Sequence, residues 1–235
     1  APAALVSSYE AAWVIGIQPQ GQSFRYLELV FEWYSALRAR GLDVNIVSPA
    51  ADLSGYRMVL VPTLPIIPEG FAEKLAALDC PVLLGPRSGS KTASFCIPDG
   101  LAPGALQALL PLTVTRVESL RDGVAEPAEG FTVTRWREDV ESDLEPELAD
   151  GAGRAVVSYQ NGVRYCSVWP DRALLTLLVE RIAGEAGVEL HDLPEGIRVR
   201  RTQTHVFTFN YSAESVFVPH LGAVLPPASW HLDPR

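Results

Sequence analysis

The segment "LDVNIVSPAADLSGYRMVLVP", residues 42–62, decides the fold of this 235-residue chain. Its two apolar runs, 42–48 and 56–62, predict short strands, and the turn signal "DLSG" lies between them. Before them, the periodic run 22–40 predicts a long helix that ends at a glycine. Short apolar strands that alternate with helices are typical of βαβ units and therefore indicate a parallel sheet.

Further elements extend this pattern along the chain. The other expected elements are strands at 3–9, 80–85, 113–120 and 131–138, a hairpin at 155–170, and helices at 68–78, 104–112 and 171–187. We therefore expect an α/β fold with a doubly wound, mostly parallel sheet and helices on both faces. This domain is expected to cover 1–187. Residues 188–235 lack a helical period and predict a small antiparallel β domain.

The composition limits the classes of partner. Hydrophobic residues make up 48% of the chain, and the mean hydropathy is +0.13, as in soluble globular proteins. The net charge of −9 argues against nucleic acid or an anionic membrane as a partner. No apolar run is long enough to span a bilayer. The three cysteines lack C-x-x-C spacing, which indicates reduced thiols in a cytoplasmic protein and no zinc site.

The loop "GPRSGSKT", residues 85–92, superficially matches a phosphate-binding motif. Ser90 stands where that motif requires a glycine, and downstream prolines break the helix that should follow Lys91. Ser88 likewise lacks the first glycine of a nucleophile turn. We predict a structural or interfacial loop that binds no nucleotide or other cofactor. Arg87 and Lys91 are expected to bond a carboxylate or a loop carbonyl, in this chain or in a neighbour.

Two further features give local expectations. The run "EDVESDLEPELAD", 138–150, has seven acids in thirteen residues but lacks the glycine of a calcium loop. We therefore expect a solvated, mobile loop rather than a metal site. Trp13 follows the first predicted strand, at the carboxyl edge where α/β sheets bind ligands, and is a candidate ligand contact. The other tryptophans are expected to pack in the core.

Several segments together resemble the middle domain of glycoside hydrolase family 42 β-galactosidases. They are "YEAAW", "GLDVNIVSPAADLSGYRMVLVPTL" and "GPRSGSK", and the tail with "FTFNYS" and "LPPASWHL" is similar to the small β domain of that family. The resemblance implies a fold of the class I glutamine amidotransferase, or flavodoxin-like, type. It also implies a trimerisation domain that follows a catalytic barrel. The missing initiator methionine agrees with a piece of a longer polypeptide.

The resemblance implies an assembly role without catalysis. Retaining glycosidases use two carboxyl groups about 5–5.5 Å apart, and in this family both belong to the barrel, so no catalytic residue can be assigned here. We expect the oligomerisation and scaffold portion of a β-galactosidase, a hydrolase acting on terminal β-D-galactosides. This portion is predicted to be inactive alone. The expected partners are further copies, as a homotrimer, and the barrel of the parent chain.

Two alternative functions remain open at this stage. One is a stand-alone, degenerate amidotransferase-like hydrolase, and the other is a carbohydrate-binding module. The first needs a nucleophilic cysteine in a glycine-flanked turn and a histidine nearby. The turn after the fourth predicted strand holds Arg87 instead, and Trp169-Pro170-Asp171 stands where amidotransferases carry His-Pro-Glu.

The helix at 22–40 suggests where an assembly contact lies. At about 100° per residue, its apolar side chains cover roughly 220° of the circumference, about twice what a one-sided surface helix needs. One stripe comprises Phe24, Leu27, Phe31 and Tyr34. The other comprises Val30, Trp33 and Leu37, and Tyr26, Leu29 and Ala36 extend it. The sheet can bury one stripe, and a neighbouring subunit, the barrel or the β domain must cover the other. The interface candidates are Trp33, Val30, Leu37, Tyr26, Arg87 and Lys91.

Overall fold

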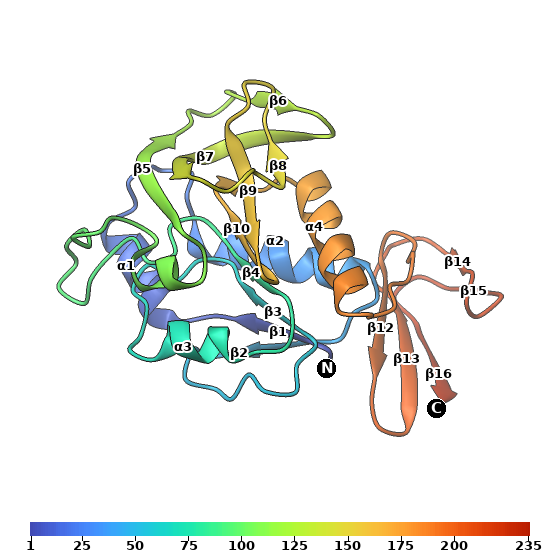
Figure 1. Cartoon of the computed structure of the whole chain (residues 1–235). Coiled ribbons are helices and arrows are strands. Elements are labelled where there is room, and N and C mark those ends of the chain that lie inside the picture. Colours follow the sequence, from blue (N-terminus) through green and yellow to red (C-terminus); the bar gives the residue numbers. More distant parts are fainter.

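The computed structural model describes all 235 residues and has a seven-stranded mixed sheet at its centre (Figure 1). The strand order is β2-β1-β3-β4-β10-β9-β8, with the first five strands parallel and the last two antiparallel to their neighbours. The bounds are β1 (Ala3–Val6), β2 (Val44–Val47), β3 (Met58–Val61), β4 (Val82–Leu84), β8 (Leu148–Ala149), β9 (Ala155–Gln160) and β10 (Val163–Cys166). In the turn of the β9–β10 hairpin, Asn161 and Gly162 both have positive φ, as the predicted type I′ turn requires.

Helices cover both faces of the parallel strands. They are α1 (Tyr9–Ile17), α2 (Tyr26–Ala39), α3 (Phe71–Ala76), the short 3-10 helix η1 (Gly104–Ala108) and α4 (Arg172–Glu185). In Figure 1, α3 lies in front of the strands and α2 behind them, where it packs against α4. This placement follows from right-handed crossovers, because the chain moves outward from β1 to β2 in one direction and from β3 to β4 in the other.

The first strand is shorter than expected, since β1 ends at Val6 and α1 begins at Tyr9. Ser8 between them has an extended backbone, and its hydroxyl accepts a hydrogen bond from the backbone N–H of Ala11. This is the N-cap geometry that starts a helix. The predicted strand over 3–9 is therefore wrong beyond Val6.

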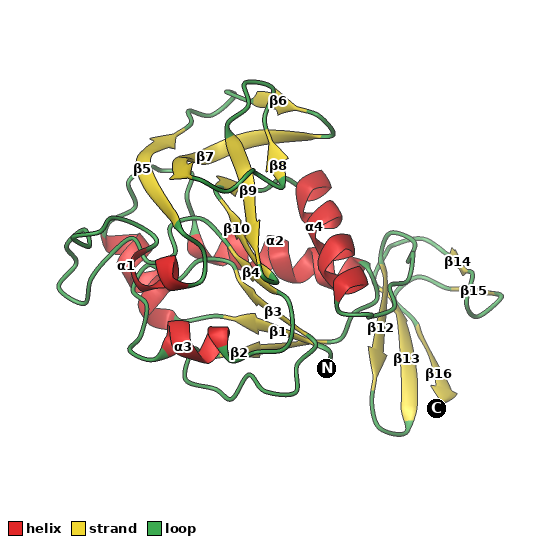
Figure 2. Cartoon of the chain, in the orientation of Figure 1, coloured by secondary structure: helices red, strands yellow, loops and turns green.

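A second, antiparallel sheet adjoins the end of the first, with strand order β11-β7-β5 and β6 paired to β7 (Figure 2). The bounds are β5 (Leu112–Ser119), β6 (Glu126–Ala128), β7 (Phe131–Ser142) and β11 (Val168–Trp169). The long strand β7 includes the start of the acidic run at 138–150, where a mobile loop was expected. That expectation is wrong for Glu138 and Asp150, which are both buried because other segments supply their hydrogen-bond donors.

The C-terminal residues form two small antiparallel sheets at one side of the molecule (Figure 1). One contains β12 (Ile197–Arg201), β13 (His205–Asn210) and β16 (Trp230–Pro234), and the other β14 (Val216–Val218) and β15 (Ala223–Leu225). Only three residues form the apolar core of this C-terminal β region, against 47 in the main core. Such a small core gains little from burial, so we expect its contacts with α2 to contribute to its order.

Those contacts centre on Asp43, which is buried at the junction. One carboxylate oxygen of Asp43 accepts from the backbone N–H of Arg201 at 3.2 Å, and the other lies 3.6 Å from Nη1 of Arg200. From the end of α2, Nη2 of Arg38 donates to the carbonyl of Val199 at 2.6 Å. The C-terminal β region is thus attached to the α/β region by hydrogen bonds and ion pairs between charged groups.

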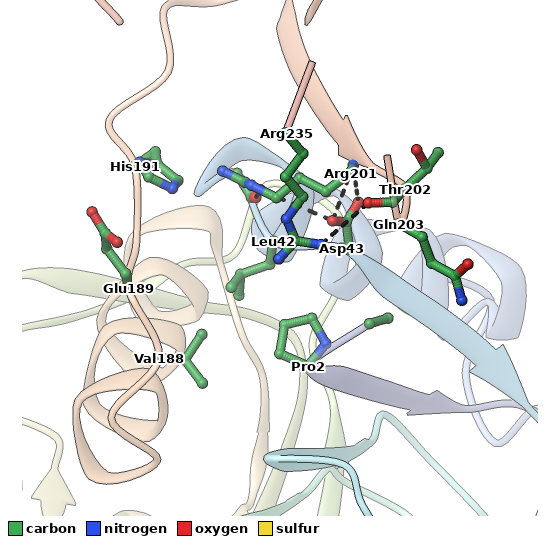
Figure 3. A pocket seen from close by; sticks show the side chains of 12 residues that line it. Pro2, Leu42, Asp43, Val188, Glu189, His191, Arg201, Thr202, Gln203 and Arg235 are labelled. Carbon is green, nitrogen blue, oxygen red and sulfur yellow. Dashed lines mark hydrogen bonds and ion pairs between the residues drawn. The ribbon is translucent and has the colours of Figure 1, made fainter. Parts of the chain in front are cut away.

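A cavity of about 500 Å³ lies beside this junction (Figure 3). Asp43, Arg201 and Arg235 gather on one side of it, and His191 and Glu189 lie on the other. Pro2 also lines the cavity, so both ends of the chain lie close to it. Most of its lining residues are polar, and none is a phenylalanine, tyrosine or tryptophan.

Candidate assembly surface and its anchors

The most exposed apolar helix face belongs to α1. The side chains of Tyr9, Trp13 and Ile17 are spaced by four residues and are 80%, 62% and 68% exposed. That spacing places them on one face of the helix. The opposite face buries Val14 and Ile15 against the body of the molecule. Contiguous apolar patches exposed to water often mark interaction sites, and this stripe is therefore the candidate assembly surface.

The N-terminal end of α1 is held by the hydroxyl of Tyr26, a buried residue at the start of α2. This oxygen accepts from the backbone N–H of Ser8 at 2.7 Å and lies 3.0 Å from the hydroxyl of Ser7. The side chain of Ser8 in turn donates to Glu10 at 2.6 Å. The Tyr26 phenol therefore fixes the turn from which α1 starts.

The C-terminal end of α1 is held by the guanidinium of Arg87. Its two terminal nitrogens donate to the carbonyls of Gln18 and Pro19 at 2.8 and 2.7 Å, at the point where the chain leaves α1. A cation is favoured there because the C-terminal end of a helix carries partial negative charge. The guanidinium also lies 4.8 Å from the ring of Phe24 and 5.1 Å from that of Trp136. These contacts match one predicted alternative for Arg87, a bond to loop carbonyls within this chain.

Glu138 supports the turn that carries Arg87. Its carboxylate accepts from the backbone N–H of Arg87 at 2.8 Å, from Nε1 of Trp136 at 3.1 Å and from the hydroxyl of Tyr165 at 2.7 Å. Arg87 has a φ of 64°, a left-handed conformation that non-glycine residues adopt at a cost. The three bonds to Glu138 hold this conformation in place. Burial raises the pKa of Glu138 and lowers the pKa of Arg87 to about 10.

The structure changes the assignment of the two stripes on α2. The interface candidates predicted from periodicity are all buried within this chain: Trp33, Val30, Leu37 and Tyr26. The large apolar side chains that α2 leaves open are Leu27 and Phe31, at 71% and 66% exposure. Periodicity identifies two stripes but not which one faces the sheet, and this is why the assignment was wrong. Among the other candidates, Lys91 is nearly buried, whereas Trp13 is exposed on α1.

A second hollow, of about 580 Å³, lies between α2, α4 and β12. Its wall includes Trp169, whose Nε1 donates to Glu32 at 2.8 Å. The guanidinium of Arg135 lies 4.6 Å from the Trp169 ring. Burial raises the pKa of Glu32. Trp169 therefore has a packing role in the position where the amidotransferase alternative would require a basic histidine.

Two of the three thiol groups, those of Cys80 and Cys166, are poorly suited to nucleophilic chemistry, whereas Cys96 lies exposed in the loop after β4. Cys166 is completely buried, and burial raises its pKa to about 12. Burial also raises the pKa of Cys80. The reactive form of cysteine is the thiolate, which these pKa values disfavour at neutral pH. No group of three or more histidine, cysteine or acidic side chains is arranged to hold a metal ion, and none of the helices combines the length and apolar character that crossing a bilayer requires.

These features define an α/β region with an appended β region, whose most exposed apolar helix face belongs to α1. The family model of the β-galactosidase trimerisation domain matches residues 1–189. The chain belongs to this family, the trimerisation domains of glycoside hydrolase family 42 β-galactosidases, and corresponds to a non-catalytic oligomerisation portion.

Individual relatives agree with this membership. A β-galactosidase of Thermus thermophilus is 49% identical over 223 residues, which are 93% of this chain and 35% of the relative. The crystal structure of a β-galactosidase from the psychrophilic Marinomonas ef1 is 33% identical and superposes with a TM-score of 0.93, covering 98% of this chain and 37% of that one. A β-galactosidase from the Antarctic haloarchaeon Halorubrum lacusprofundi gives a TM-score of 0.91 at 31% identity, covering 100% of this chain and 40% of that one. The chain thus spans little more than a third of the length of these relatives.

Proposed function

We propose that this chain is the oligomerisation and scaffold portion of a retaining β-galactosidase that hydrolyses terminal β-D-galactosides in the cytoplasm. It assembles as a homotrimer and braces the catalytic barrel of the same polypeptide. Within it, 1–187 is the trimerisation domain and 188–235 is the small β domain. The family membership and the names of the relatives support this proposal. The observation that carries it is the stripe of Tyr9, Trp13 and Ile17 on a helix held at both ends.

The proposed fold relationship to class I glutamine amidotransferases rests on topology. The strand order β2-β1-β3-β4 and the left-handed conformation of Arg87, in the turn that follows β4, support it. The groups at the corresponding positions, Arg87 and Trp169, are buried and bonded to neighbouring groups in this chain. This argues for a scaffold that has an enzyme-like fold without its chemistry.

The carbohydrate-binding alternative would place a sugar on the aromatic side chains of β13. Phe207 and Phe209 lie 6.0 Å apart at an interplanar angle of 7°, and Phe209 and Tyr211 lie 5.7 Å apart at 24°. At these separations the rings lie side by side, and Tyr211 is 71% exposed, so this row of rings is the feature that supports the alternative. The family match over residues 1–189 supports assembly instead.

The first prediction tests the surface directly. Trp13→Glu places a charge in the middle of the α1 stripe, where the burial of an unpaired carboxylate would oppose association. We expect the wild-type chain to sediment as a trimer at tens of micromolar and Trp13→Glu to sediment as a monomer. The melting temperature of the monomeric unit should change little, because the side chain is exposed.

Tyr211→Glu is the matched control for this test, because Tyr211 is an equally exposed aromatic residue on the C-terminal β region. We expect it to leave the trimer intact. A wild-type chain that sediments as a monomer at this concentration would refute the assembly role. If Tyr211→Glu dissociated the trimer and Trp13→Glu did not, the subunit contact would lie on the C-terminal β region and not on α1.

A further inference from the structure

The orientation of α1 depends on contacts at its two ends. The helix has only nine residues, and isolated helices of this length are marginal in water. It buries just Ala11, Val14 and Ile15 against the rest of the chain. Such a narrow contact can hold the helix near the body of the molecule, but it gives little resistance to rotation or fraying.

The two side chains that hold its ends come from different parts of the fold. Tyr26 belongs to α2, and its hydroxyl accepts from Ser8 just before α1. Arg87 belongs to the turn after β4, and its guanidinium donates to Gln18 and Pro19 just after α1. Both side chains are buried. Helix α1 is therefore connected to α2 at one end and to the central sheet at the other.

We propose that Tyr26 and Arg87 are positioning residues for self-association, which present the α1 stripe in a fixed orientation before any partner binds. The inference rests on the proposed assembly function and deepens it. A surface that is already ordered loses less conformational freedom on binding, and so binds more tightly with the same contacts. Neither side chain needs to touch the partner for this effect.

The sharpest variant is Tyr26→Phe, which removes one hydroxyl and leaves the buried ring in place. We expect the trimer dissociation constant, measured by sedimentation, to rise at least tenfold with an unchanged circular dichroism spectrum. Hydrogen exchange of the backbone amides at 9–17 should accelerate in the monomer. The matched control is Tyr56→Phe, because that hydroxyl accepts from Asn45 in β2 at 3.0 Å and bonds to neither end of α1. It should change neither quantity.

Arg87 is tested by a graded pair of variants. Arg87→Met keeps much of the apolar stem and loses both carbonyl bonds, whereas Arg87→Lys keeps the charge and one donor group. We expect association to weaken in the order wild type, Arg87→Lys, Arg87→Met. Val156→Ala, a core substitution in β9, serves as the control for lost stability. It should lower the melting temperature without weakening association.

The outcomes separate this inference from the proposed function. If Trp13→Glu dissociates the trimer while Tyr26→Phe and both Arg87 variants associate as the wild type does, the positioning role is refuted and the assembly surface stands. If Val156→Ala weakened association as much as the Tyr26 and Arg87 variants do, the positioning role would also be refuted, because a general loss of stability would then explain the weaker association. A monomeric wild-type chain would refute both.

Discussion

Glu138 lies at the centre of the buried polar cluster that supports the turn at Arg87. A carboxylate in this position is stabilised by three hydrogen bonds and by the nearby guanidinium, and destabilised by the loss of water around it. The raised pKa indicates that the loss of hydration is the larger effect. The contribution of this cluster to the stability of the fold should therefore depend on pH.

Replacement of Glu138 by Gln tests this dependence, because it keeps the shape and removes the charge. A folded-state pKa above the unfolded value means that the carboxyl group supports folding fully below the ordinary pKa of 4.5 and that this contribution is lost as pH rises through the folded value. We therefore expect the free energy of unfolding of the wild type, relative to Glu138→Gln, to fall as the pH rises above 4.5. The slope for one group is at most about 1.4 kcal/mol per pH unit.

Urea denaturation of both proteins across this range gives the measurement. The titratable neighbours do not interfere, since the pKa of Arg87 is about 10, that of Cys166 is about 12 and that of Tyr165 is raised well above 10. If the free energy of unfolding of the wild type relative to Glu138→Gln stayed constant or grew with pH, the raised pKa of Glu138 would be contradicted.

At the scale of elements, α4 shows how a helix is fixed by its first residue. Asp171 is its N-cap, and one carboxylate oxygen accepts from the backbone N–H of Leu174 at 2.8 Å. The other oxygen accepts from the backbone N–H of Thr132 in β7 at 2.7 Å. One side chain thus starts the helix and attaches it to the second sheet.

Asp171→Ala should therefore lower the free energy of unfolding by more than the loss of an ordinary helix cap does. We expect a loss of about 2 kcal/mol in the free energy of unfolding, with about 1 from the cap and about 1 from the bond to Thr132. Urea denaturation at neutral pH measures it. Thr176→Ala on the same helix removes only a bond to the carbonyl of Arg172 and should stay within about 0.5 kcal/mol. Equal losses in both variants would argue against the double role.

At the scale of the whole molecule, the junction at Asp43 joins the α/β region to the C-terminal β region. The side chain is buried and meets two arginines from β12. Removing one partner from a buried charged cluster leaves the others without compensation. The junction should therefore contribute more to the stability of the C-terminal β region than the few apolar residues of that region do.

Asp43→Asn should lower the free energy of unfolding by about 3 kcal/mol. We also expect the amides of β12 and β13 to exchange before those of the central sheet, because the C-terminal β region would open separately. Asp192→Asn is the control, because Asp192 is exposed and pairs with Arg40 at the surface. This substitution should lower the free energy of unfolding by less than about 1 kcal/mol. Cooperative exchange of both regions in Asp43→Asn would contradict this role of the junction.

The local pattern of residues determined the elements that could be predicted. Helices α2 and α4, the parallel strands and the β9–β10 hairpin follow from periodicity and turn chemistry, which act between residues close in sequence. The family could also be predicted, because the segments at 42–64 and 85–91 carry its pattern and the family model matches 1–189. Ser8 and Glu10 were usable signals for α1, since a capping serine followed by an acidic residue marks a helix start.

Tertiary structure alone decided which surfaces became available. Trp33 and Phe31 lie on the same apolar helix, yet the first is buried and the second is exposed. Glu138 belongs to an acidic run, yet it is buried because Arg87 and Tyr165 come from distant parts of the chain to bond it. The anchoring of α1 likewise joins Ser8 to Tyr26 and Gln18 to Arg87. Burial and hydrogen bonding between distant residues depend on how whole elements pack, and periodicity along the chain contains no information about that packing.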